Sequence, residues 1–195
     1  MRQNIFLNSV LNRGAILGFV MLCSHVFEQC AVVYGGTMAW FSVMGAEIVA
    51  SCALYCWMLY RFAKEFSLSV MEKQQIKMFS YGAALNYTLS VSMLGGVIVG
   101  LGRYILHSFV IGHQRYVESM VTSLQTALNS NPQTASMMDS YKQLFAQIAS
   151  QPEPGIFSTL FSTMWNYVLF GFFVGLVVAA FVKREPQLFD KSSEE

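Results

Sequence analysis

Five ionisable or amide side chains stand out because they lie within long apolar stretches of this 195-residue chain: His25, Glu28, Glu47, Arg103 and Asn166. A charged side chain at the centre of a bilayer costs about 3 kcal/mol on insertion scales, so each one needs an explanation. Imidazole, carboxylate, guanidinium and amide groups together are suited to relaying protons or holding a small polar ligand. These five residues are the candidate intramembrane polar cluster.

Depth along the helices predicts which of these side chains could meet. At about 1.5 Å of rise per residue, counted from a turn at Gly35, Glu28 and Glu47 both lie about 10 Å below the outer boundary. Two such carboxylates on adjacent helices could share one proton, because like charges at close range cannot both ionise. His25 precedes Glu28 by one helical turn and shares its face. Arg103 could reach water or a carboxylate with its long side chain.

A structural role is the simpler interpretation of the same residues. Glu28, Glu47 and Arg103 could form an ion-pair cluster that locks the helices together, or the carboxylates could lie in a wetter mouth of the bundle. Proton relay or ligand binding is the alternative. A single sequence gives depth but not the direction in which each side chain points, so these interpretations stay open.

Cys23, His25, Glu28 and Cys30 are close in sequence but are not suited to binding one metal ion. At about 100° per residue, the two cysteines share one helix face while His25 and Glu28 point to the other side. Haem with two histidine ligands is not expected either, because His25 lies near mid-membrane and His107 at the outer surface. We expect no metal and no cofactor, and we expect the cysteines to be buried free thiols.

The chain carries no established enzymatic signature. It has no glycine-rich phosphate loop and no nucleophile placed with a histidine and an acid, so we predict no catalytic residues and a protein that is not an enzyme. Its net charge of +1 also argues against a nucleic-acid partner bound through phosphate neutralisation.

Four apolar stretches, over about 15–34, 40–60, 81–106 and 156–182, must position the polar residues. A bilayer core about 30 Å thick needs roughly 20 apolar helical residues to cross it. The chain is 54% hydrophobic and only 12% charged, against about 25% charged in soluble domains. We predict an all-α membrane protein with one domain over 1–195, in which four transmembrane helices form an antiparallel bundle in the lipid bilayer.

Residues 112–155 are the one sizeable region outside these spans. Two apolar stripes at helical spacing, separated by a break at Pro132, predict an extracytoplasmic two-helix insert between the third and fourth spans. The first stripe comprises Val117, Met120, Val121, Leu124 and Leu128, and the second Met137, Met138, Tyr141, Leu144, Phe145 and Ile148. The insert would cover the outer mouth of the bundle, or contact a protein partner or a second copy of the chain.

Basic residues gather on one side of the predicted membrane. Nine of the 12 Lys and Arg residues lie in the amino-terminal segment, in 61–80 or in the carboxy-terminal tail. Because cytoplasmic loops carry the excess of Lys and Arg, we expect both termini to be cytoplasmic in a multi-pass protein of the inner (cytoplasmic) membrane. We expect 61–80 to lie along the lipid headgroups.

Small residues recur every four positions, which predicts close helix packing. Gly96 and Gly100 mark the third span, and Gly171 and Gly175 mark the fourth. Such faces let helix backbones approach in lipid, within one chain or between two. The first pair lies in the outer half and the second nearer the middle and inner half, so the pairs are not expected to face each other directly.

The order of these features resembles a family of small four-helix inner-membrane proteins of Gram-negative bacteria that is classed as a domain of unknown function. The resemblance rests on Phe79-Ser80-Tyr81-Gly82-Ala83-Ala84 at the start of the third span, the Gly- and Ser-rich helix that follows, the helical insert, and the Lys183-Arg184 end of the last span. It implies an inner-membrane location and four helices, and no known activity.

The leading prediction for function is a non-catalytic integral membrane protein, an accessory or assembly component whose insert contacts a partner. The alternative is a small transporter or proton-coupled protein that uses Glu28 and Glu47.

Overall fold

The computed structural model describes residues 2–75, 78–129, 138–150 and 152–183. These residues are helical almost throughout. The elements are α1 (Arg2–Tyr34), α2 (Gly36–Gln74), α3 (Tyr81–Ile105), the π-helix η1 (Leu106–Ile111), α4 (His113–Asn129), α6 (Met138–Ala149) and α7 (Ile156–Val182).

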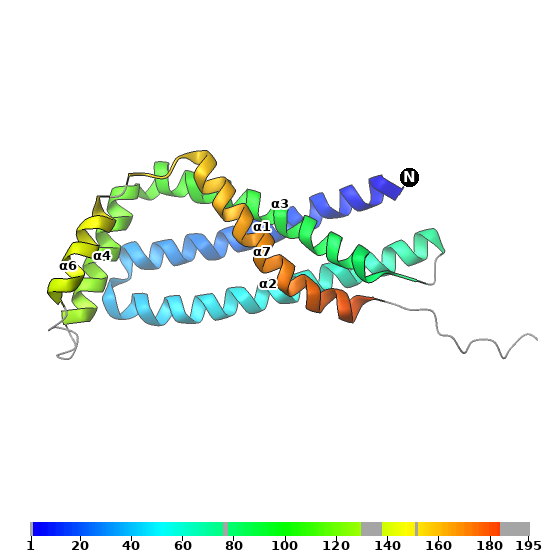
Figure 1. Ribbon diagram of the computed structural model, residues 1–195, viewed down its shortest axis with the longest axis horizontal. Helices are drawn as coiled ribbons and strands as arrows, with labels where there is room; N and C mark the ends of the chain where they lie inside the picture. The colour runs from blue at the N-terminus through cyan, green and yellow to red at the C-terminus, as the bar shows by residue number, and fades with distance from the viewer. Residues whose placement is uncertain (1, 76–77, 130–137, 151, 184–195) are drawn as a thin grey trace, which may run out of the picture.

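Four of the helices are long and apolar enough to cross a membrane: Ile5–Tyr34, Val43–Lys73, Tyr81–Ile111 and Ile156–Val182. This finding confirms the prediction of an all-α, four-span membrane protein with helices inserted between the third and fourth spans. The start of α1 and the end of α7 lie at one end of the molecule, whereas α4 and α6 lie at the opposite end (Figure 1). Consecutive spans run in opposite directions between these two ends.

A tight turn at Gly35 joins the first two spans. Its amide donates to the Ala31 carbonyl oxygen over 2.9 Å, and a Cβ at this position would lie 2.5 Å from that same oxygen. Only glycine fits without displacing the helix end, so α1 and α2 are forced into an antiparallel hairpin.

The second span extends well beyond its predicted end at residue 60. α2 continues to Gln74 and ends where Gln75 adopts a left-handed conformation with φ of 52°. Residues 61–74 contain neither Gly nor Pro, and Phe62 and Phe66 are buried in the core, so nothing interrupts the helix. Residues 61–74 of the segment predicted to lie along the headgroups are therefore the last part of α2, and α1 likewise begins at Arg2 rather than near residue 15.

The packed core lies toward the end of the bundle where α1 starts and α7 ends. The Phe66 and Tyr87 rings stack with centroids 4.1 Å apart, and Leu17, Leu59 and Val91 belong to the same cluster and are fully buried. All four spans contribute to this one cluster.

The four predicted packing glycines lie at the contact between α3 and α7. A Cβ at Gly100 would lie 3.0 Å from the Leu160 Cα, and one at Gly96 would meet α7 one turn further along. Gly171 and Gly175 meet α3 at Ser92 and Thr88, closer to the start of that helix. The two pairs thus share one interface but are offset along it, so neither pair faces the other.

In its described residues the insert forms two helices that pack on each other, with α4 also contacting α1 and α2. Val117 on α4 and Phe145 on α6 are buried, whereas Leu144 is 47% exposed. The other residues of the predicted apolar stripe of α4 are half-buried: Met120, Val121, Leu124 and Leu128. The predicted break at Pro132 and the start of the second stripe at Met137 lie outside the described residues.

The cysteines are free, as predicted, but they are not buried. Cys23, Cys30 and Cys52 are exposed on the surface of the bundle, and Cys56 is half-buried. Their helix faces point away from the core, which the helical spacing alone did not reveal.

Candidate functional site

The centre of the polar region is Gln29 on α1, whose side chain is 1% exposed. Its amide Nε2 donates to the Nε2 atoms of two imidazole rings, that of His25 at 3.2 Å and that of His107 at 2.7 Å. The amide Oε1 is buried and has no hydrogen-bond partner among the described residues. A buried amide with one end unsatisfied is costly, by about 1–3 kcal/mol, which marks this position as unusual.

Glu28 continues the polar chain on the other side of His25. The Nδ1 atom of His25 lies 2.8 Å from Glu28 Oε2, and both side chains are about one-fifth exposed, at 18% and 20%. The spacing of one helical turn places the two groups together on α1. His107, Gln29, His25 and Glu28 thus form a continuous series of hydrogen-bonded groups, here called the polar relay.

His107 reaches this relay because the third span does not end as a regular helix. Residues Leu106–Ile111 widen into the π-helix η1, and Gly112 then adopts a φ of 84° before α4 begins. A π-helical turn changes the direction of the side chains that follow it, and such turns are frequent at functional sites. The positive φ at residue 112 suits only glycine, and the chain turns there into α4, which runs across the direction of α3 (Figure 1).

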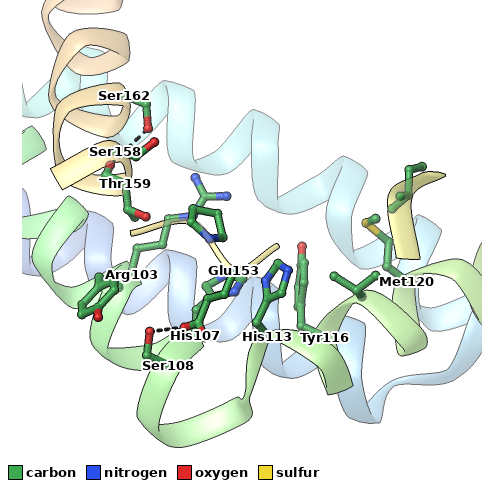
Figure 2. A pocket seen from close by; sticks show the side chains of 14 residues that line it. Arg103, His107, Ser108, His113, Tyr116, Met120, Glu153, Ser158, Thr159 and Ser162 are labelled. Atoms are coloured by element: carbon green, nitrogen blue, oxygen red, sulfur yellow. Dashed lines mark hydrogen bonds between the residues drawn. The ribbon is translucent and has the colours of Figure 1, made fainter. Parts of the chain in front are cut away.

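Beside His107 a cavity of about 330 Å³ opens between the outer end of α3, η1, α4 and the start of α7. Figure 2 shows that its polar lining comes from several elements. The polar or ionisable side chains around it are Arg103, Tyr104, His107, Ser108, His113, Tyr116, Glu153, Ser158, Thr159 and Ser162. We call this space the outer cavity.

Tyr116 on α4 connects the outer cavity with the relay. Its ring meets that of His107 edge to face, with centroids 4.8 Å apart. Burial raises the pKa of the Tyr116 hydroxyl, and the nearby Glu28 carboxylate raises it further. The phenol is therefore protonated at neutral pH. It can act as a hydrogen-bond donor beside His107 and Glu28, the two relay groups that lie near it.

Arg103 extends from α3 toward the start of α7, where Ser158 and Thr159 lie (Figure 2). The ion pairs within the described ranges join Arg13 to Glu65, Arg61 to Glu65 and His25 to Glu28. The ion-pair cluster of Glu28, Glu47 and Arg103 that the structural interpretation requires is thus not formed by the described residues.

Glu47 lies in a separate network. Its Oε1 accepts hydrogen bonds from Ser24 and Ser51, each at 2.6 Å, and the two hydroxyls are themselves 2.5 Å apart. Asn166 lines a second cavity of about 240 Å³ together with Ser51. Of the five predicted residues, His25, Glu28 and Arg103 therefore lie at the relay and the outer cavity, and Glu47 and Asn166 lie near Ser51.

Gln29 is not among the predicted residues, although it follows His25 by four residues and so shares its helix face; Asn166 is the one amide that the predicted cluster includes. The expected separation of His25 from His107 in depth is wrong, because the Gln29 Nε2 atom lies 3.2 Å from the His25 ring and 2.7 Å from the His107 ring. No sequence signal announced the π-helical turn.

In the part of the chain that the structure describes, no group of three or more His, Cys, Asp or Glu side chains is close enough to hold a metal ion. The relay instead offers imidazole and carboxylate groups, which can gain and lose protons, joined by an amide that hydrogen-bonds to both imidazoles.

Comparison with known proteins gives one match. No curated protein and no solved structure matches the chain. A family described as "Protein of unknown function (DUF4199)" matches residues 12–184, which include all four spans and the insert. The chain therefore belongs to the DUF4199 family of proteins of unknown function.

Proposed function

We propose that this protein is a non-enzymatic, proton-coupled membrane protein in which protons pass between the outer cavity and Glu28. One observation carries the proposal: the polar relay runs without a break from His107 on the cavity wall, through Gln29, to His25 and Glu28 inside the first span. Polar and ionisable groups inside a bilayer are expensive, and chains of them are the usual structure of proton pathways.

The buried amide suggests how the relay works. With Nε2 between the rings, Gln29 donates to two unprotonated ring nitrogens and leaves Oε1 without a partner. An amide turned over by half a rotation would place Oε1 between the rings, where it would accept from rings protonated at Nε2. The observed orientation therefore fits two rings without an Nε2 proton, and the turned orientation fits two rings that each carry one. The amide keeps both of its own protons, so its orientation follows the protonation state of the rings, while His107 and His25 take up and release the protons.

We further propose that the protein lies in the inner (cytoplasmic) membrane with both termini in the cytoplasm. The distribution of basic residues supports this orientation. The first half of α1 carries Arg13 and the second half of α2 carries Arg61 and Lys64, and cytoplasmic segments are rich in such residues. The start of α1 and the end of α7 lie at one end of the bundle (Figure 1). The outer cavity would then open to the extracytoplasmic side.

Proton flux into liposomes tests the proposal. Purified protein is reconstituted with a trapped pH-sensitive dye, and the rate of internal pH change is followed after an external pH step. We expect Gln29→Ala to lower the protein-dependent rate by about a hundredfold, since positioned proton-transfer groups contribute factors of that size. Gln147→Ala, at an exposed site on α6, is the matched control and should behave as wild type.

Two results would contradict the proposal. One is an unchanged rate in Gln29→Ala protein, and the other is a wild-type rate equal to that of protein-free liposomes. A second measurement does not depend on flux: in nitrogen-labelled protein, the Nε2 signals of His25 and His107 should show hydrogen bonding to the Gln29 amide in wild type and lose it in Gln29→Ala.

An accessory role is the second candidate, and one feature favours it. Helices α4 and α6 stand outside the spans at one end of the molecule (Figure 1), where a partner protein or a second copy could contact them. A photo-crosslinking residue at the exposed Leu144 should then capture a specific protein from native membranes. Recovery of the uncrosslinked chain alone would count against this role.

A further inference from the structure

We infer that the outer cavity is a binding site for the oxyanion of a small phosphate or carboxylate compound, with Arg103 as the cation that holds it. The inference deepens the proposed function, because His107 of the relay forms part of the same cavity wall. A ligand bound there would contact the group from which protons enter the relay.

The first argument is the charge and position of Arg103. Its side chain is half-buried on α3 and lines the cavity, and no ion pair of the described residues neutralises it. A guanidinium is always charged and presents a planar fork of donors that matches the two oxygens of a carboxylate or phosphate. Held at the outer end of a membrane span, it is placed to attract an anion from outside.

The second argument is the start of α7, toward which Arg103 extends (Figure 2). The first helical hydrogen bond of α7 runs from the Thr159 amide to the Gly155 carbonyl oxygen over 3.0 Å, so the amides of 156–158 lie outside the ladder. Gly155 supplies no side-chain cap. Ser158 and Thr159 add two hydroxyls to the same cavity wall. An uncapped helix start next to an arginine is an environment that favours an oxyanion.

The third argument concerns the rest of the ligand. Glu153 also lines the cavity and accepts a hydrogen bond from Ser108 of η1. Its carboxylate would repel a second negative charge and would accept a hydrogen bond from an amine or hydroxyl. The volume of about 330 Å³ lies at the lower end of the range for small-molecule sites. The cavity therefore fits a small compound with an oxyanion at one end and an amine at the other.

Two sources could supply this chemistry. A free solute could enter from the extracytoplasmic side, or the headgroup of a phosphatidylethanolamine lipid could enter from the membrane. Phe157 and Phe161 on α7 are 85% and 62% exposed and would contact acyl chains beside such a headgroup. The experiment must distinguish the two.

Calorimetric titration with phosphoethanolamine is the direct test, using the full chain in detergent at neutral pH. Loss of a charge-assisted hydrogen bond to the oxyanion should weaken binding in Arg103→Gln by about thirtyfold. Arg115→Gln is the matched control: this arginine lies over the Tyr34 ring, 5.1 Å from its centroid, and does not line the cavity. It should bind like wild type. Equal affinity in Arg103→Gln and wild type would overturn the inference.

Glu153→Gln should affect the binding of two probes, phosphoethanolamine and inorganic phosphate, in different ways. It should weaken phosphoethanolamine binding, because the amine loses its acceptor, and it should leave inorganic phosphate bound as tightly or more tightly. A parallel loss for both probes would contradict the assigned role of Glu153.

A further test uses wild-type protein only, so its result does not depend on whether a variant folds correctly. Phenylglyoxal, which modifies arginine, should react with Arg103 more slowly when phosphoethanolamine is present, while Arg115 in the same molecule reacts at an unchanged rate. If a lipid already occupies the site, free phosphoethanolamine will not bind; native mass spectrometry should then show a retained phosphatidylethanolamine that Arg103→Gln loses. Absence of both forms of Arg103-dependent binding would overturn the inference.

Failure of this inference and failure of the proposed function are distinguishable. Gln29→Ala leaves the cavity residues in place, so it should bind phosphoethanolamine with wild-type affinity. Such binding, together with no proton flux in wild type, would leave the site standing and remove the relay. Proton flux that depends on Gln29, together with no ligand binding that depends on Arg103, would support the relay and rule out the binding site.

Discussion

Gly96 on α3 and Tyr167 on α7 are in direct contact: a Cβ at position 96 would lie 2.7 Å from the Tyr167 Cβ and 2.9 Å from the Met164 Cα. Helix association in lipid depends on such close approach, because lipid tails are as apolar as the side chains they would replace. A substitution at Gly96 therefore tests whether close packing of α3 against α7 stabilises the bundle.

The first prediction concerns that contact. Gly96→Ala should destabilise the bundle by about 1–3 kcal/mol, because the added methyl group meets backbone that cannot move aside. Gly82→Ala is the control, since a Cβ there meets nothing within 4 Å; it should be neutral, or stabilising by up to about 1 kcal/mol. Reversible unfolding in mixed micelles measures both. Equal stability of the two variants would show that α3 and α7 are not packed as described.

A second prediction addresses the hydrogen bonds between α2 and its neighbours. The Tyr55 hydroxyl donates to Ser92 at 2.8 Å and to the Tyr167 carbonyl oxygen at 3.2 Å. Tyr55→Phe should cost about 1 kcal/mol. A double-mutant cycle with Ser92→Ala should give a coupling energy near 0.6 kcal/mol, as for other buried pairs in membranes. Tyr60→Phe, at an exposed tyrosine, should leave stability unchanged. A comparable loss of stability in Tyr60→Phe would show that the effect of Tyr55→Phe does not come from its hydrogen bonds.

Third, the two intramembrane carboxylates should act independently. Glu28 is paired with His25 and Glu47 with Ser24 and Ser51, so no shared partner couples them. The destabilisation of Glu28→Gln and that of Glu47→Gln should add to within about 0.5 kcal/mol in the double variant. A coupling energy well above this value would support the prediction that Glu28 and Glu47 share one proton.

The insert supplies a fourth prediction, based on two neighbouring residues of α6. Phe145 is 5% exposed and Leu144 is 47% exposed. Phe145→Ala should release α6 from α4 at a cost of about 3 kcal/mol, which hydrogen exchange would register as faster exchange of both helices. Leu144→Ala should leave the exchange rates near those of wild type. The opposite ranking would mean that α6 packs with its other face.

Fifth, membrane topology can be measured directly. Reporters that are active only in the cytoplasm, fused in turn to each end of the chain, should both be active if the bias of basic residues sets the orientation. A reporter inserted after Gly112, at the start of the insert, should be inactive. One active and one inactive terminus would contradict the four-span arrangement as well as the orientation.

Composition and pattern alone were enough to predict the four spans, the two insert helices and their order. Long apolar runs have one low-energy solution in a bilayer, because every backbone polar group must be paired within the helix. The fourth span was predicted with the bounds of α7 itself, Ile156–Val182, because Pro154 and Gly155 precede it. Helix ends without such residues, as in α2, were predicted too short.

Only the tertiary structure decided which polar side chains meet. Helical periodicity gives the relative direction of residues on one helix, so the pairing of His25 with Glu28 could be foreseen. It cannot give the rotation of one helix against another, and so the meeting of Glu47 on α2 with Ser24 on α1 could not be foreseen. The meeting of Gln29 with His107 depends in addition on the π-helical turn of η1, a local change of pitch that packing imposes and that residue types alone do not encode.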